Sequence, residues 1–285
     1  MIETYKIGDV TLTFDSGRHI YTINGVKADG VTSALGVIDK SGALIHWAVN
    51  DNALAYVFGG GKYKLPASII PGVTYDEVQL MQIRNEAKGM HQKKKVEAAG
   101  VGTLVHEWIE KHIKNKIKIA GSPDLTLDEL KALELEMPHS ETMKNAIGAF
   151  MAWEAEHEVK YLFSEKRICH PKHKYAGTLD FEAVVDGDLC IGDLKTSNAI
   201  YNEYRFQTSA YLEARALETG QAYKARWCVR VGKDTQTDQN GLETVEFEAK
   251  RYGQSEHRKD FKTFLAALTI YRRLRELNKD KYGKN

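Results

Sequence analysis

The chain has 285 residues, of which 42% are hydrophobic and 28% charged, fractions that are ordinary for a soluble globular protein with a sizeable core. Its 40 Lys and Arg residues nearly balance 39 Asp and Glu residues, so the net charge of +1 lacks the basic excess that would itself indicate nucleic-acid binding. The three cysteines are scattered and odd in number, which argues against a disulfide framework, and they are too few to ligate an iron–sulfur cluster.

The amino-terminal residues Met1-Ile2-Glu3-Thr4 lack the basic and apolar pattern of a secretory signal. No apolar run approaches the roughly 20 residues that are needed to span a bilayer. Together with the cysteine content, which indicates a reducing compartment, these features predict a cytoplasmic protein without a membrane partner.

The first third of the chain combines a β-hairpin pattern with two helical stretches. Apolar and polar residues alternate over residues 8–27. Residues 41–57 begin with a serine that can cap a helix, and residues 75–99 are polar and helix-forming. We therefore expect an N-terminal accessory segment over residues 1–100, followed by a core with a C-terminal helix over residues 101–285.

A helix is also predicted over Val101–Glu110, which reads V-G-T-L-V-H-E-W-I-E. A zinc-protease motif needs a second His four positions after the first, and Glu110 stands there instead, so this chemistry is excluded. His106 by itself allows two interpretations, a metal ligand or a hydrogen-bonded histidine of the core. Glu110 can orient His106 from the next helical turn or simply face solvent.

Two shorter helices and a strand are expected next. Thr126 and Glu129 fit a capping box at the start of the first helix. The second helix opens at Ser140, and its apolar stripe is interpreted as core rather than as a binding surface. Residues 161–169 then read as a strand beside the central hairpin.

The central hairpin follows at Tyr175, where two β-prone runs flank the turn Asp186-Gly187. Because side chains alternate across a strand, Asp193 and Lys195 of the second run share one face. An acid and a lysine on an otherwise apolar strand are costly to bury unless something pairs with them.

A divalent metal ion is one such partner. Asp180 and Asp193 lie on adjacent antiparallel strands, and Mg²⁺ prefers a few carboxylates while it keeps several waters. Lys195 beside them can orient or deprotonate a water, or neutralise charge on a phosphate, so the set is suited to phosphodiester hydrolysis. The alternative is an ordinary surface hairpin with an Asp–Lys pair, because the tripeptide Asp-x-Lys is common.

Three short motifs in a fixed order favour the metal site. They are Gly177-Thr178-Leu179-Asp180, Asp193-Leu194-Lys195-Thr196 and Gln207-Thr208-Ser209-Ala210-Tyr211. In this order and spacing the chain resembles the RecB-like branch of the PD-(D/E)XK nuclease superfamily, which combines G-x-x-D, D-x-K-T and Q-x-x-x-Y motifs. The resemblance is strongest over residues 101–232, and Leu179 stands where a proline usually precedes the first motif Asp.

The resemblance implies an α/β fold with a mixed central β-sheet flanked by helices, as in restriction endonucleases. It implies these residues as catalytic or site-organising groups: Asp180, Asp193, Lys195, Gln207 and Tyr211. It also matches His106 to an upstream G-T-x-x-H motif, so the implied metal ligands are His106, Asp180, Asp193 and the backbone carbonyl of Leu194. Glu165 resembles a further acidic position of this branch, or else it pairs with Lys166 or Arg167.

By this resemblance the protein is expected to be an Mg²⁺- or Mn²⁺-dependent deoxyribonuclease, an exonuclease rather than a restriction-type endonuclease. Residues 21–33 resemble the leader of phage-borne members, which implies a role in phage-type DNA recombination, repair or replication in the cytosol of a bacterial host. The expected partners are DNA and a single-strand annealing or recombination protein. Two alternatives stay open: a non-catalytic nuclease-fold module that binds DNA or such a partner, and RNA processing. The sequence does not indicate the polarity of cleavage, a preference for single or double strands, or the oligomeric state.

Overall fold

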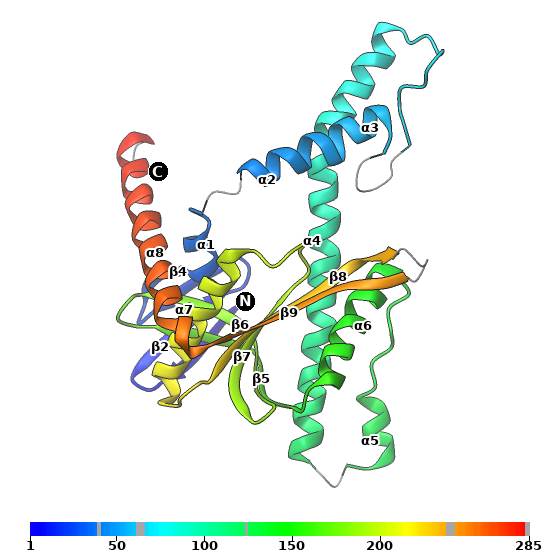
Figure 1. Ribbon diagram of the computed structural model, residues 1–285. Helices are drawn as coiled ribbons and strands as arrows, with labels where there is room; N and C mark the ends of the chain where they lie inside the picture. Colours follow the sequence, from blue (N-terminus) through cyan, green and yellow to red (C-terminus); the bar gives the residue numbers. More distant parts are fainter. Residues whose placement is uncertain (39–40, 61–65, 123–124, 238–242, 283–285) are drawn as a thin grey trace. The chain divides into compact units, whose positions relative to one another are not determined.

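The computed structural model describes residues 1–38, 41–60, 66–122, 125–237 and 243–282 (Figure 1). The chain divides into two compact units, one made of Met1–Ile38 with Leu104–Asn285 and the other of Asp39–Thr103. The expected boundary at residue 100 lies close to the second break, but residues 1–38 group with the core instead of with the helical segment. No described helix has an apolar stretch long enough to cross a membrane.

The smaller unit is helical. Its elements are α2 (Ser41–His46), the π-helical η1 (Trp47–Leu54), α3 (Ala55–Phe58) and the first part of α4 (Glu77–Gly121). The helix predicted for residues 41–57 is thus present, with a π-helical segment in which the buried Asn52 side chain donates to the carbonyl of Trp47 (2.7 Å). The stretches predicted as separate helices over residues 75–99 and 101–110 are one continuous helix, α4, because Gly100 and Gly102 sit among helix formers and do not interrupt it.

The N-terminal strands form an antiparallel meander that joins the central sheet. The strands are β1 (Ile2–Ile7), β2 (Val10–Asp15), β3 (Ile20–Ile23) and β4 (Val26–Gly30). β4 pairs in parallel with β6 through Asp29↔Tyr175 and Gly30↔Ala176, and buried side chains such as Leu12 and Phe14 pack against Ala176. This pairing is why residues 1–38 belong with the core.

In the described part of the chain the sheet has nine strands, in the order β1-β2-β3-β4-β6-β7-β8-β9, with β5 paired to the opposite edge of β6. The remaining strands are β5 (Val159–His170), β6 (Tyr175–Val185), β7 (Asp188–Lys195), β8 (Ala225–Thr237) and β9 (Glu243–Gly253). β7 and β8 are parallel. β5 and β7 are both antiparallel to β6, and β9 is antiparallel to β8. The predicted turn between β6 and β7 is confirmed, because Asp186 (φ 50°) and Gly187 (φ 83°) both have the positive φ that a type I′ hairpin requires.

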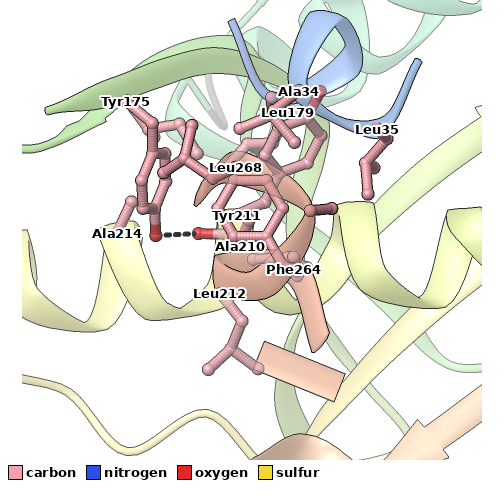
Figure 2. Packing of buried hydrophobic residues seen from close by; sticks show 14 of the residues in the cluster. Ala34, Leu35, Tyr175, Leu179, Ala210, Tyr211, Leu212, Ala214, Phe264 and Leu268 are labelled. Atoms are coloured by element: carbon pink, nitrogen blue, oxygen red, sulfur yellow. Dashed lines mark hydrogen bonds between the residues drawn. The ribbon is translucent and has the colours of Figure 1, made fainter. Parts of the chain in front are cut away.

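Helices flank this mixed α/β sheet. They are α1 (Val31–Leu35), α5 (Leu127–Ala132), α6 (Glu141–Glu156), α7 (Asn202–Thr219) and α8 (Gln254–Tyr282). α1, α7 and α8 share a buried cluster with β6, in which the Tyr175 hydroxyl donates to the carbonyl of Ala210 (2.9 Å; Figure 2). The predicted capping box of Thr126 and Glu129 is present, and α7 ends at Gly220 with φ 67°.

Ion pairs join α8 to Asp29 of β4. Arg272 and Arg275 of α8 both pair with its carboxylate, with N···O distances of 2.7 and 2.6 Å. Asp29 is buried, so each partly exposed arginine contributes a charge-assisted hydrogen bond in a partly desolvated setting. The helix α8 is therefore tied by two ion pairs to the end of β4.

Candidate active site

The site lies where the sheet divides along one edge of β6. β4 pairs with Tyr175 and Ala176, β7 pairs with residues 181–185, and among the described strands neither reaches residues 177–180 on that edge. Asp180 lies at the end of this gap, and its Oδ2 accepts a hydrogen bond from the backbone amide of Leu194 (2.5 Å). Asp180 therefore lies directly before the first residue of β6 that pairs with β7, and its side chain takes the hydrogen bond of a β7 amide.

Asp193 is the hub of the second and third motifs. Its side chain is 2% exposed, its Oδ1 accepts from Nε2 of Gln207 (3.0 Å), and its Oδ2 forms an ion pair with Lys195. The same Gln207 nitrogen donates to the Tyr211 hydroxyl (2.9 Å). Four of the residues expected at the site therefore form one connected polar network.

The charges in this network perturb one another. Burial raises the pKa of Asp193 to about 7, against the lowering influence of Lys195, and the nearby Asp180 carboxylate adds to the rise. Burial by itself lowers the pKa of Lys195, but the carboxylates of Asp193 and Asp180 outweigh it, so its pKa lies above the ordinary value. Lys195 is therefore a cation held among acids, and it also lies over the ring of Tyr204 (4.9 Å).

The first and third motifs meet through Gly177. A Cβ atom at this position would lie only 2.7 Å from Cε1 of the Tyr211 ring, closer than carbon atoms pack. Glycine is therefore required for the tyrosine of α7 to approach β6, and this gives the glycine of the G-x-x-D motif a physical role.

A second group of potential ligands lies beside Asp180. His106, Glu165 and Asp180 each offer one ligand atom, and these atoms all lie within 4.8 Å of one another. Nδ1 of His106 is 3.9 Å from Oδ1 of Asp180, and the His106 side chain is 31% exposed, so it is not a core histidine. Asp193 is not one of these three residues; its carboxylate contacts Lys195 and Gln207, and it stays a predicted metal ligand.

Glu165 owes its position to the register of β5. The pairs Ser164↔Phe181 and Lys166↔Leu179 place it directly opposite Asp180. Its φ of 49° is left-handed, which is uncommon for a residue other than glycine and costs about 1–3 kcal/mol. Such strain clusters at functional sites, and the surrounding β5–β6 ladder is what holds it here.

The electrostatics of Glu165 indicate that a cation fits this group. Burial raises its pKa to about 8, and the carboxylates of Asp180 and Glu110 add to the rise, while Arg167 only partly offsets them. An imidazole nitrogen with crowded carboxylate oxygens is a donor set suited to Mn²⁺ or Mg²⁺, and a divalent cation would relieve the repulsion between the acids. The residues present therefore fit the metal that the motifs imply, and the carbonyl of Leu194 stays a predicted ligand.

Sequence reasoning gave no site role to Tyr204 or Arg167. Tyr204 lies three residues before Gln207 and so shares its helical face, which is the signal that could have found it. Arg167 lies two residues after Glu165 on β5 and donates to it from Nη1 (3.3 Å). The two interpretations of Glu165 are thus compatible, because it pairs with Arg167 and also lies in the ligand group.

The sequence matches no protein-family model and no curated protein. Among solved structures, it is similar to an alkaline exonuclease (LHK-Exo) from Laribacter hongkongensis, with 13% identity and a TM-score of 0.27 over 61% of this chain and 93% of that one. It is also similar to SSO0001, with 10% identity and a TM-score of 0.26 over 57% of this chain and 74% of that one. Because these TM-scores are low, the function is inferred from the geometry of the site.

Proposed function

We propose that the protein is a metal-dependent nuclease that hydrolyses phosphodiester bonds in DNA, with Mg²⁺ or Mn²⁺ as cofactor. The observation that carries the proposal is the convergence of His106, Glu165 and Asp180 within 4.8 Å, beside the ion pair of Asp193 and Lys195. An ordinary surface hairpin does not account for this arrangement, because the Asp193 carboxylate is buried and bridges two elements.

The residues divide the work between them. A divalent ion bound there supplies a Lewis acid for the phosphoryl oxygen and lowers the pKa of a water molecule. Asp180, Glu165 and His106 provide the ligand atoms. Lys195, a cation held by Asp193, neutralises charge on the reacting phosphate or orients the water, and Gln207 fixes the Asp193 carboxylate.

The mode of action and the biological setting rest on the motifs. We propose an exonuclease of phage-type DNA recombination, repair or replication that works with a single-strand annealing or recombination protein. The supporting features are the order and spacing of the G-x-x-D, D-x-K-T and Q-x-x-x-Y motifs. Residues 39–103 form a compact unit of their own. We propose that this unit is the accessory segment and that it is separate from the catalytic unit.

The test is digestion of linear and covalently closed circular DNA, single- and double-stranded, with Mg²⁺, Mn²⁺ or EDTA. Loss of only the linear forms, blocked by EDTA, is the expected result. Cutting of circles would make the protein an endonuclease. Binding of DNA without cleavage under either metal would overturn the nuclease assignment and favour a non-catalytic module, and a parallel RNA substrate separates the RNA-processing alternative.

A further inference from the structure

Arg167 links the ligand group to the N-terminal strands. Its Nη1 donates to Oε2 of Glu165 (3.3 Å) and to the Thr178 hydroxyl (3.0 Å). That hydroxyl lies 3.0 Å from the hydroxyl of Tyr21, which is buried in β3. A chain of hydrogen bonds therefore runs from β3 through β6 to Glu165.

The other contacts of this guanidinium also come from the N-terminal meander. Arg167 lies over the ring of Phe14 in β2, with Cζ 4.7 Å from the ring centroid. Its Nε lies 3.6 Å from a carboxylate oxygen of Glu3 in β1. β1 and β2 thus each contribute one side chain that contacts the arginine, and Tyr21 of β3 reaches it through Thr178. The Arg167 side chain is only 17% exposed.

We propose that Arg167 is a positioning residue, which holds the Glu165 carboxylate toward His106 and Asp180, and that the N-terminal strands act on the metal site through it. The inference rests on the proposed metal site. Glu165 has three rotatable side-chain bonds and a left-handed backbone, so its carboxylate can adopt many other conformations. A fixed hydrogen-bond donor that excludes these conformations raises the effective concentration of the carboxylate oxygen at the metal site.

The sign of the effect separates positioning from simple electrostatics. Arg167 is a positive charge close to a cation site, so its removal would tighten metal binding if repulsion were its main influence. If it positions Glu165, its removal weakens binding, by about 10- to 100-fold as is typical when the partner of a metal ligand is removed. The two roles therefore predict opposite shifts of the dissociation constant.

The experiment is titration of the metal-free full-length protein with Mn²⁺ by isothermal calorimetry. The variant Arg167→Met removes both the positive charge and the N–H donors of the guanidinium group. The variant Arg167→Lys keeps the charge but cannot bridge Glu165 and Thr178 in the same way. The matched control is Lys166→Met, which removes the neighbouring charge of the same strand, where Lys166 pairs with Glu218 (3.5 Å). The part of the heat of Mn²⁺ binding that disappears in Asp180→Asn is assigned to the proposed metal site.

We expect Arg167→Met to weaken Mn²⁺ binding by about tenfold or more, Arg167→Lys to restore it only in part, and Lys166→Met to leave it unchanged. Tighter or unchanged binding in Arg167→Met, or an equal loss in Lys166→Met, would overturn the inference. If the wild-type protein binds Mn²⁺ no better than Asp180→Asn does, the proposed metal site itself is refuted.

Two milder variants keep the inference testable if Arg167→Met does not fold. Thr178→Val and Tyr21→Phe each remove one hydroxyl from the chain of hydrogen bonds and leave the charges unchanged. Thr178→Val is expected to weaken Mn²⁺ binding more than Tyr21→Phe, because only Thr178 contacts the arginine. Wild-type affinity in Thr178→Val would argue against the proposed role.

Discussion

The backbone amide of Leu194 donates a 2.5 Å hydrogen bond to Oδ2 of Asp180, at the point where β7 separates from β6. The other oxygen of the same carboxylate, Oδ1, lies 3.9 Å from Nδ1 of His106. Asp180 thus serves the fold with one oxygen and the candidate metal site with the other, and substitutions can separate these two roles.

Asp180→Asn keeps an oxygen that can accept from Leu194 but loses the charge needed to bind a metal ion. We expect it to abolish DNA cleavage while it leaves the melting temperature close to that of the wild type. Asp180→Ala leaves the amide of Leu194 unsatisfied, and we expect a further loss of about 1–3 kcal/mol in the free energy of unfolding. Cleavage assays and urea unfolding check both, and near-normal turnover in Asp180→Asn would refute the site.

Lys195→Ala and Asp193→Ala test the second half of the site. We expect each to reduce cleavage by at least about 10²-fold, because a preorganised charge beside the reacting phosphate is lost or misplaced. Circular dichroism should show that the fold is retained. A useful control is Lys172→Ala, which removes a lysine of the turn between β5 and β6; slow cleavage there as well would indicate a general effect of charge.

Gly177→Ala should disturb the site through packing alone. The new Cβ would lie 2.7 Å from the Tyr211 ring, and relief of this clash moves the ring that holds Gln207. We expect a loss of about 1–3 kcal/mol in stability together with reduced cleavage. Gly148→Ala in α6 is the matched control, since its Cβ would meet nothing within 4 Å and alanine favours a helix. Equal stability of the two variants would contradict the close approach of Tyr211.

The Glu154 carboxylate makes the free energy of unfolding depend on pH in the acid range. Burial would raise its pKa, but hydrogen bonds from His112 and Lys116 outweigh burial and lower the pKa from 4.5 to about 2. Because the folded-state pKa is below the unfolded one, the carboxylate stabilises the fold fully above pH 4.5, and this contribution is lost as the pH falls toward 2. It amounts to on the order of 3 kcal/mol.

Urea unfolding of the wild type and of Glu154→Gln at pH 6 and pH 3 measures this contribution. The wild type should be the more stable protein at pH 6, and the difference should shrink at pH 3. A difference that is the same at both values would mean that the Glu154 carboxylate is not the group responsible.

Local patterns were sufficient for several elements. The turn Asp186-Gly187 and the capping box at Thr126 each depend on a few neighbouring residues, and the structure has both. The shared face of Asp193 and Lys195 was also predictable, because side chains alternate along a strand, whereas the association of Gln207 with them was implied by the resemblance of the motifs.

Long-range pairing was not predictable in the same way. The parallel contact of Asp29 with Tyr175 joins segments far apart in sequence, and neither β4 nor β6 carries a local signal for it. Glu165 came to the site because it stands opposite Asp180 in a paired ladder, and only the register reveals that. The sequence offered Arg167 only as a partner of Glu165, and its contacts with Thr178, Phe14 and Glu3 became known only from the structure.

The ion pairs of α8 with Asp29 join segments that are made at different times during synthesis of the chain. The strands around Arg167 leave the ribosome before β6, and Arg272 and Arg275 follow later still, so β4 gains its parallel neighbour and its ion pairs only after those segments have been made. Contacts between distant segments slow folding, because a long loop must close before they form. A nascent chain in which α8 has not yet been made therefore carries every residue of the candidate site without the two ion pairs that hold Asp29 of β4.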